Sequence, residues 1–245
     1  MTPLAIIGGT GLTRLPDLVI ERRERISTPY GAPSANLVFG RLLDQELIFL
    51  ARHGDPHAIP PHRVNYRANL WALKEVGAAG VIAVAAVGGI RADMVPGRIA
   101  VPDQIIDYTY GRAHTFHEDD LDQVTHIDFS QPYSGWLQEK LLAAARFACI
   151  DVVVGGVYGC TQGPRLETAA EISRMERDGC DMVGMTGMPE AALAREIGLG
   201  YACCAVVANW AAGKQAGEIT LAEIEANLLA GMTDLAAILR HLVQS

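Results

Sequence analysis

The sequence is short of cysteine, of long apolar runs and of positive charge, and each shortage excludes a class of protein. The five cysteines are an odd set with no C-x-x-C pair, so neither a disulfide framework nor a zinc site is expected. No apolar run reaches the roughly 18 residues of a membrane-spanning helix. A net charge of −8 argues against a nucleic-acid partner and leaves a small molecule as the expected ligand.

Several motifs that define other classes of protein are also missing. Met1-Thr2-Pro3 leads straight into an apolar run without a charged leader, so we expect a cytoplasmic protein. Arg14 stands where a dinucleotide-binding fingerprint needs its third glycine, and neither a P-loop nor a G-x-S-x-G nucleophile elbow occurs. His53, His57 and His62 lie among prolines that prevent a helical ligand pair, so no metal site is expected.

Half of the 245 residues are hydrophobic and a fifth are charged, which is typical of one large domain. Continuous apolar runs predict a first strand near residues 5–7 and further strands, buried on both faces, at 47–51, 81–87, 99–101, 152–157, 181–185 and 201–208. Helical patterns that end at glycine, or that begin at a Thr220/Glu223 capping box, predict helices at 64–76, 167–178, 190–197 and 221 to about 243. We therefore expect a single α/β domain over residues 1–245, with a mixed central β-sheet flanked by helices.

A polar segment at residues 107–132 carries Glu118-Asp119-Asp120 and three histidines, and it reads as a long excursion from the sheet. Long loops of this kind in compact domains are usually functional or make subunit contacts.

The first strand breaks into a glycine-rich turn, Gly8-Gly9-Thr10-Gly11. Glycines let bare backbone N–H groups converge on an anion, and the threonine adds a hydroxyl donor. The turn is suited to phosphate, although a tight strand-to-helix turn without a ligand has the same composition.

Polar groups follow the other strands at the same point, where each apolar run ends. They are Arg52-His53-Gly54, Gly88-Gly89, Met185-Thr186-Gly187 and Asn209. Because ligands of open α/β sheets sit beyond the carboxyl ends of the strands, these residues and Thr10 predict one small oxyanion site. Arg-His-Gly after a strand also occurs in phosphatases that phosphorylate a histidine, so His53 as a nucleophile stays an alternative.

Five blocks of sequence occur in an order that is specific to one enzyme family. They are residues 6–12, Arg52-His53-Gly54, residues 64–74, Gly163-Pro164-Arg165 and residues 185–190. Together they resemble the methylthioadenosine phosphorylase branch of the purine nucleoside phosphorylases, from residue 5 to about residue 230. The resemblance implies a homotrimeric α/β enzyme of purine salvage, a pentosyltransferase that cleaves a nucleoside with inorganic phosphate as co-substrate and uses no metal or organic cofactor.

The resemblance also assigns roles to individual positions. Phosphate would be bound by Thr10, Arg52, His53 and Thr186 and by the backbone at Ala85 and Ala86, where Ala85 replaces a residue that is often polar in the family. The nucleoside would be bound by Met185 against the ribose and by Leu166, Glu167, Asn209, Trp210 and Ala211, while His126 would reach the 5′ pocket of the neighbouring subunit.

Asn209 is the residue that we expect to select the base, and to act catalytically by stabilising the charge on it. Relatives that act on a 6-aminopurine resemble Asp-x-Asp here, whereas this chain reads Asn209-Trp210-Ala211. A 6-oxopurine presents a carbonyl at position 6, which a carboxylate repels and an amide N–H satisfies. The pattern therefore favours hypoxanthine or guanine, although an asparagine that caps a turn is the structural alternative.

The substituent at the 5′ carbon is the second determinant of the substrate. Leu221 stands near the start of the last helix, where relatives that prefer a 5′-hydroxyl have a histidine, and an apolar wall suits a methylthio group. We therefore predict phosphorolysis of S-methyl-5′-thioinosine to hypoxanthine and S-methyl-5-thio-α-D-ribose 1-phosphate. Phosphorolysis of inosine or guanosine, phosphorolysis of methylthioadenosine, and a purine-sensing module without catalysis are the alternatives.

Overall fold

The centre of the molecule is a set of parallel strands that are apolar along almost their whole length. In this computed structural model, which describes residues 2–9, 12–13, 15, 17–118 and 123–244, β1 (Leu4–Gly8) lies between β4 (Gln45–Ala51) and β5 (Gly80–Gly89). The long strand β11 (Gly200–Trp210) pairs in parallel with β5. Valine, isoleucine and alanine dominate these strands because both faces of the sheet are covered.

Antiparallel pairs at both sides make this an eleven-stranded mixed sheet within the described residues. On one side, β2 (Leu18–Glu24) and β3 (Leu37–Leu42) continue from β4 as antiparallel neighbours. The other side is built from β10 (Met182–Gly184) antiparallel to β5, β6 (Ile99–Val101) antiparallel to β11, and the parallel additions β9 (Val157–Cys160), β7 (Gln104–Asp107) and β8 (Val153–Val154). The expected mixed α/β architecture is confirmed.

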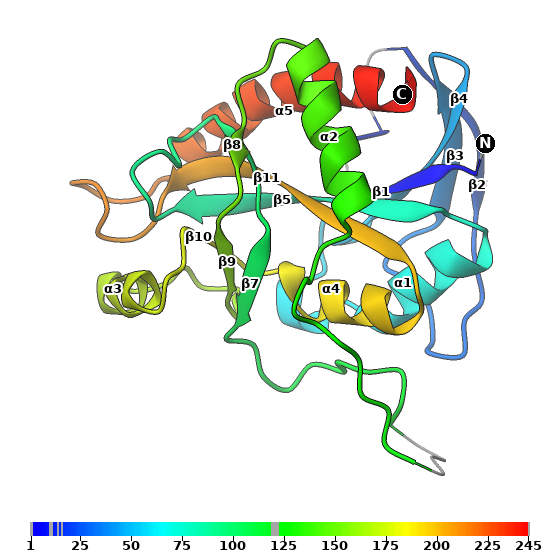
Figure 1. Cartoon of the computed structure of the whole chain (residues 1–245), viewed down its shortest axis with the longest axis horizontal. Coiled ribbons are helices and arrows are strands. Elements are labelled where there is room, and N and C mark those ends of the chain that lie inside the picture. The colour runs from blue at the N-terminus through cyan, green and yellow to red at the C-terminus, as the bar shows by residue number, and fades with distance from the viewer. Residues whose placement is uncertain (1, 10–11, 14, 16, 119–122, 245) are drawn as a thin grey trace.

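Helices cover both faces of the sheet and give it two cores (Figure 1). One face packs α1 (Tyr66–Glu75) and α4 (Gly187–Glu196) against alternate strand residues such as Ala5 and Ile7. The opposite face packs α2 (Gly135–Phe147) and α5 (Leu221–Gln244) against Ile6. A smaller cluster lies under α3 (Ala169–Arg177), and none of the helices in the described ranges combines the length and apolarity that a bilayer crossing requires.

The predicted strands and helices are present, with one strand divided. The run 152–157 is broken at Gly155 and Gly156, whose φ angles of 78° and 114° interrupt the extended backbone between β8 and β9. The capping box of α5 is confirmed, since the amide of Glu223 donates to the Thr220 hydroxyl oxygen at 3.3 Å and the Thr220 amide donates back to the Glu223 carboxylate at 3.4 Å.

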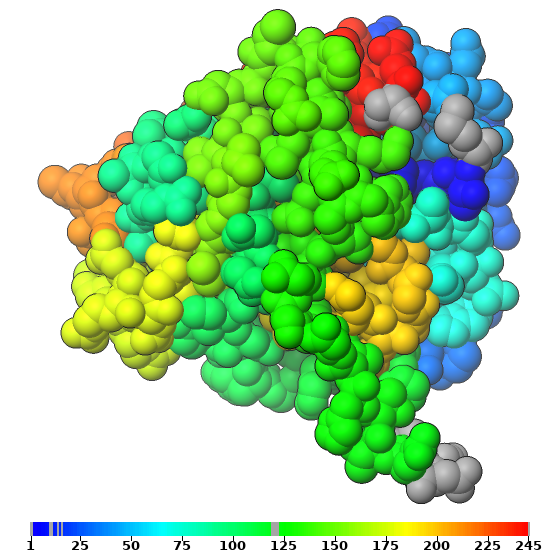
Figure 2. All heavy atoms as spheres, viewed as in Figure 1, coloured from blue at the N-terminus to red at the C-terminus, as the bar shows by residue number. Residues whose placement is uncertain are grey.

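The polar excursion follows β7 and contains no helix or strand within its described residues 108–118 and 123–132. Figure 2 shows it projecting from the body of the molecule. Its first residues nevertheless run close to the sheet, since the Tyr108 amide donates to the carbonyl oxygen of Cys160 at 2.8 Å.

Candidate active site

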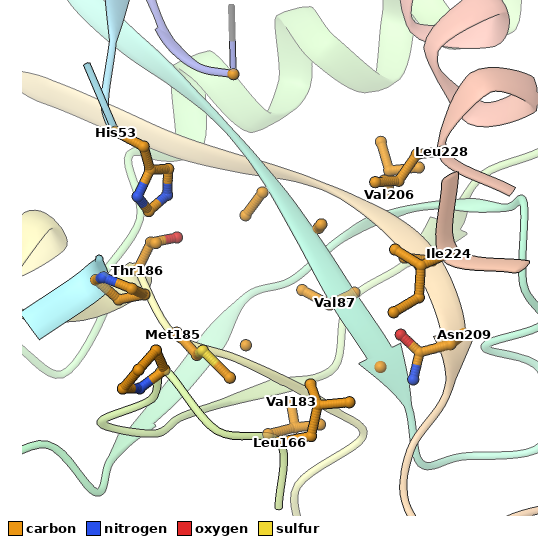
Figure 3. Close-up of a pocket in the computed structure, with 18 of the residues that line it drawn as sticks. His53, Val87, Leu166, Val183, Met185, Thr186, Val206, Asn209, Ile224 and Leu228 are labelled. Atoms are coloured by element: carbon orange, nitrogen blue, oxygen red, sulfur yellow. The ribbon is translucent and has the colours of Figure 1, made fainter. Parts of the chain in front are cut away.

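A cavity of about 880 Å³ lies along the carboxyl-terminal halves of β5 and β11. Its other walls come from the segment after β4, from residues 164–167, from the loop that joins β10 to α4, and from α5. In Figure 3, His53 and Thr186 lie at one end and Asn209 with Ile224 at the other, with Val87 between them. The cavity thus has two polar ends joined by an apolar middle.

His53 presents one ring nitrogen as a hydrogen-bond acceptor. Its Nδ1 lies 2.8 Å from the carbonyl oxygen of Ile59, and because a carbonyl only accepts, Nδ1 carries the proton and Nε2 holds the lone pair. Burial, followed by the positive charge of Arg52, lowers the pKa of His53 to about 4. At neutral pH the ring is therefore uncharged and can accept a hydrogen bond from a protonated ligand oxygen.

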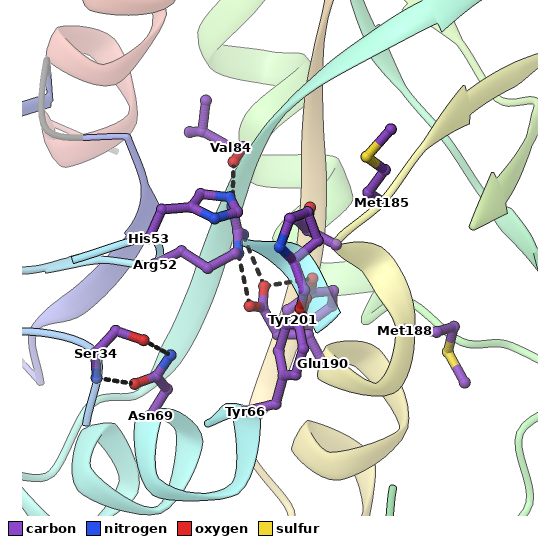
Figure 4. A network of polar contacts seen from close by, with 12 residues as sticks. Ser34, Arg52, His53, Tyr66, Asn69, Val84, Met185, Met188, Glu190 and Tyr201 are labelled. Carbon is purple, nitrogen blue, oxygen red and sulfur yellow. Dashed lines mark hydrogen bonds and ion pairs between the residues drawn. The ribbon is translucent and has the colours of Figure 1, made fainter. Parts of the chain in front are cut away.

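Arg52 is fixed by a buried network that the sequence did not suggest (Figure 4). Its Nε and Nη2 donate to the two carboxylate oxygens of Glu190 at 2.7 Å each, and its Nη1 donates to the carbonyl oxygen of Val84 at 2.8 Å. The Tyr201 hydroxyl donates to the same carboxylate at 2.9 Å. Burial opposes the charge of Arg52, but the Glu190 carboxylate outweighs it and raises the pKa of the guanidinium.

The donors of Arg52 are only partly used by this network. A guanidinium has five N–H groups, and Glu190 and Val84 accept from three of them. The other two donors have no acceptor among the described residues, on a side chain that lines the cavity while being only 2% exposed. The same arginine can therefore bind an anion and keep its internal ion pair.

Asn209 owes its position to an irregularity in β11. The register with β5 shifts between Val207 and Asn209, which leaves Ala208 unpaired as in a β-bulge. The Asn227 side chain of α5 donates to the carbonyl oxygen of Ala208 at 2.9 Å. The Nδ2 of Asn209 donates to the carbonyl oxygen of Trp210 at 2.7 Å, which identifies the nitrogen and leaves Oδ1 and a second N–H for a ligand.

A carboxylate, Glu167, lines the same cavity. Its Oε1 accepts a hydrogen bond from the Thr161 hydroxyl at 2.6 Å, which restricts the side chain while other acceptor sites of the carboxylate remain. Leu166 precedes it in the chain and is 45% exposed, so this part of the cavity wall has an apolar side chain next to a hydrogen-bond acceptor.

Apolar side chains from α5 form a further part of the wall. Ile224 and Leu228 are one turn apart on this helix, and Figure 3 shows Leu228 next to Val206 of β11. Leu12, Ile219 and Met232 complete this wall. All of these wall side chains are apolar, and the Asn209 amide lies next to Ile224 (Figure 3).

Most residues that the sequence singled out come together in this cavity. Those that line it are Arg52, His53, Ala85, Ala86, Leu166, Glu167, Met185, Thr186, Asn209 and Ala211. Thr10 lies outside the described residues, while its neighbour Gly9 lines the cavity.

Three of the expected positions lie elsewhere. Leu221 is 76% exposed at the first residue of α5, ahead of the turns that face the cavity, so Ile224 and Leu228 supply the apolar wall in its place. Trp210 contributes its carbonyl oxygen to Asn209 and does not line the cavity. His126 is exposed on the excursion, and its expected contact with a neighbouring subunit stays a prediction.

Sequence reasoning missed the partner of Arg52. Glu190 is fully buried, 138 residues away in the chain, and its position after a proline gave no hint of an ion pair. The available signal was charge itself, since a carboxylate inside an otherwise apolar helix is seldom buried without a partner.

The fold is an α/β sheet covered by helices with a cavity that has two polar ends, and the profile of the Phosphorylase superfamily matches residues 3–244. The chain belongs to the Phosphorylase superfamily.

Among individual relatives, it is 57% identical over 245 residues, all of both chains, to the "Probable S-methyl-5′-thioinosine phosphorylase" of Pseudomonas syringae. It is 44% identical over 229 residues to the "6-oxopurine nucleoside phosphorylase" of Pyrococcus furiosus, covering 91% of this chain and 85% of that one. A solved structure of methylthioadenosine phosphorylase from Schistosoma mansoni with adenine superposes with a TM-score of 0.92 at 33% identity, covering 100% of this chain and 91% of that one.

Proposed function

We propose that this protein is a phosphorylase of S-methyl-5′-thioinosine, which releases hypoxanthine and forms S-methyl-5-thio-α-D-ribose 1-phosphate. The observation that carries the proposal is the pairing of an amide, Asn209, with a carboxylate, Glu167, along one cavity. The name of the Pseudomonas relative supports the same substrate.

The amide and the carboxylate suit a 6-oxopurine on two edges. Hypoxanthine has an N1–H donor and a carbonyl at position 6, so Glu167 can accept from N1 and the free N–H of Asn209 can donate to O6. A 6-aminopurine has a bare N1 lone pair, which a carboxylate repels. Its 6-amino group is a donor and leaves the free N–H of Asn209 without an acceptor. These two mismatches are a basis for selecting between the bases.

The apolar wall formed by Ile224, Leu228, Val206 and Met232 supports a methylthio group at the 5′ carbon. A 5′-hydroxyl placed against these side chains would lose its hydrogen bonds to water without replacement. Inosine and guanosine are the second candidates, and the Pyrococcus relative's name is the reason to include them in the test.

The polar end around His53 supports binding of inorganic phosphate. The two remaining donors of Arg52, the Thr186 hydroxyl and the backbone at Ala85 and Ala86 can donate to its oxygens, and Nε2 of neutral His53 can accept from a protonated one. Thr10, next to the cavity residue Gly9, would add a hydroxyl.

In the proposed reaction a phosphate oxygen forms a bond to C1′ of the ribose while the bond from C1′ to N9 breaks. The electron pair of that bond moves into the purine, and the ribose gains cationic character. Asn209 donates its free N–H to O6 and stabilises the developing charge there, an effect of about 2.7–4 kcal/mol for a preorganised donor. The purine anion takes up a proton from water to give hypoxanthine. Phosphate held opposite the base supplies proximity and opposes the cationic charge.

We propose several further properties of the whole protein. We infer a cytoplasmic enzyme of purine salvage that needs no metal or organic cofactor, in one domain over residues 1–245. We also infer a homotrimer, for which sedimentation equilibrium should give about three times the chain mass of 26.3 kDa. A mass equal to one chain would reject the trimer and leave the proposed reaction standing.

A base-release assay tests the reaction directly. The purified protein is incubated with methylthioinosine, methylthioadenosine, inosine or guanosine, with and without phosphate, and the free base and sugar phosphate are quantified. We expect phosphate-dependent release of hypoxanthine, fastest from methylthioinosine. Binding without release would support a purine-sensing module, and phosphate trapped covalently on His53 would support the histidine phosphatase.

A further inference from the structure

Arg112, in the excursion after β7, is a buried cation that lies outside the cavity lining. It is 8% exposed, and all three of its guanidinium nitrogens donate hydrogen bonds. Within the described residues, its acceptors are all neutral oxygens. The guanidinium of Arg112 has five N–H donors, and neutral oxygens accept from them. If one of these oxygens moved away, a buried N–H would lose its hydrogen bond, so Arg112 fixes the positions of its acceptors.

One set of acceptors belongs to the segment that follows β9. The Nη2 of Arg112 donates to the carbonyl oxygens of Thr161 at 3.1 Å and Gln162 at 2.9 Å, and its Nε donates to the Gln162 side-chain oxygen at 3.1 Å. The same segment carries the base-side residue Glu167, whose carboxylate accepts from the Thr161 hydroxyl. Arg112 thus holds the backbone from which Glu167 is positioned.

A second set of acceptors belongs to the loop between β10 and α4. The Nη1 of Arg112 donates to the carbonyl oxygens of Met185 at 2.9 Å and Met188 at 2.6 Å. These two carbonyls bracket Thr186, which lines the polar end of the cavity and is 8% exposed. The Tyr66 hydroxyl, 3.2 Å from the same nitrogen, anchors this group to α1.

We propose that Arg112 is a positioning residue that holds the base-side segment and the phosphate-side loop at a fixed separation. This inference rests on the proposed function, in which C1′ and phosphate must meet in line between these two segments. A planar fork can hydrogen-bond to both at once, whereas a lysine ammonium is a single point of attachment. Misplacement by about 1 Å of groups that orient a reaction can cost about 100-fold in rate.

The test measures steady-state kinetics of Arg112→Lys with methylthioinosine and phosphate each varied. We expect KM to rise for both substrates and kcat/KM to fall by about 10- to 100-fold. Two comparison variants each affect one segment: Thr186→Ala should raise mainly the KM for phosphate, and Glu167→Gln mainly the KM for nucleoside. Arg41→Lys, on the remote strand β3, is the matched control and should behave as wild type.

The outcomes separate this inference from the proposed function. If wild type releases no base, the proposed function fails first. If wild type is active but Arg112→Lys changes neither KM, or lowers only the melting temperature, Arg112 is structural and the inference is overturned. If Arg112→Lys does not fold, Gln162→Ala decides: removal of one acceptor should raise the nucleoside KM by about 2- to 10-fold, and an unchanged KM overturns the inference.

Discussion

At the scale of single residues, the site depends on the buried ion pair between Arg52 and Glu190. Both side chains are closed off from water, with 2% and 0% of their surfaces exposed. Removal of one partner from a buried pair costs about 3–5 kcal/mol because the other charge is left uncompensated. We expect Glu190→Gln to lower the free energy of unfolding by about that amount in urea denaturation.

A second arginine provides the matched comparison, since Arg165 makes the same two-point contact with Glu171 on the surface. Glu171→Gln keeps a side chain that suits the capping box of α3 and removes only an exposed charge pair. We expect its unfolding curve to stay close to that of wild type. Equal decreases in the free energy of unfolding of Glu190→Gln and Glu171→Gln would contradict the claim that burial makes the Arg52–Glu190 pair more stabilising than the exposed one.

Because His53 is neutral in the folded protein, we expect it to affect how stability changes at acid pH. Its pKa is about 4 in the folded protein and ordinarily 6.5, so between these values the unfolded chain binds a proton that the folded one does not. The stability contribution is therefore complete above pH 6.5 and is lost as the pH falls toward 4. We expect the free energy of unfolding of His53→Gln to fall less between pH 7.5 and pH 5 than that of wild type.

The exposed His126 offers the control for this measurement, because it lies on the excursion away from the cavity. His126→Gln should keep the wild-type decline in stability between the two pH values. Parallel declines for wild type and His53→Gln would show that burial of the ring is not the cause.

At the scale of elements, the bulge in β11 decides which face Asn209 occupies. Side chains along a strand point to alternate faces of the sheet. One extra residue at Ala208 therefore moves the side chains that follow it, Asn209 first, to the opposite face. The Asn227 amide of α5 holds the carbonyl of that extra residue. Asn227→Asp removes the donor without changing the size of the side chain, and we expect the nucleoside KM to rise by about 2- to 10-fold.

In Asn227→Asp the KM for phosphate should stay unchanged, because other elements position the residues proposed to bind phosphate. Glu225→Gln, an exposed neighbour on α5, should leave both values at the wild-type level. A rise in the phosphate KM as large as that for nucleoside would mean that Asn227 supports the helix as a whole.

The elements that could be predicted from sequence are those with strong local patterns. The apolar runs of β4, β5 and β11 and the Thr220 cap of α5 belong to this group. Strand β2 was missed because its sequence, LVIERRE, is charged and largely exposed at the edge of the sheet. The bulge at Ala208 was missed because the local sequence does not indicate it, and the contact to its carbonyl comes from Asn227 of α5, 19 residues away.

At the scale of the whole molecule, the cavity joins segments that are far apart in the chain, from Gly9 to Met232. Convergence at strand ends predicted most of its polar residues, since that rule follows from the topology of parallel sheets. The internal contacts of Arg52 and Arg112 could not be predicted, because buried pairing depends on how loops of distant sequence pack. The proposed recognition of the base depends on residues from several of these segments.

The most direct test of that account is the ratio of kcat/KM for methylthioinosine to kcat/KM for methylthioadenosine, measured with saturating phosphate in wild type and in Asn209→Asp. We predict a ratio well above one in wild type and a decrease of at least about tenfold in the variant, through slower release of hypoxanthine and faster release of adenine. A wild-type ratio near one, or a ratio that Asn209→Asp leaves unchanged, would contradict the reading of a 6-oxopurine by Asn209.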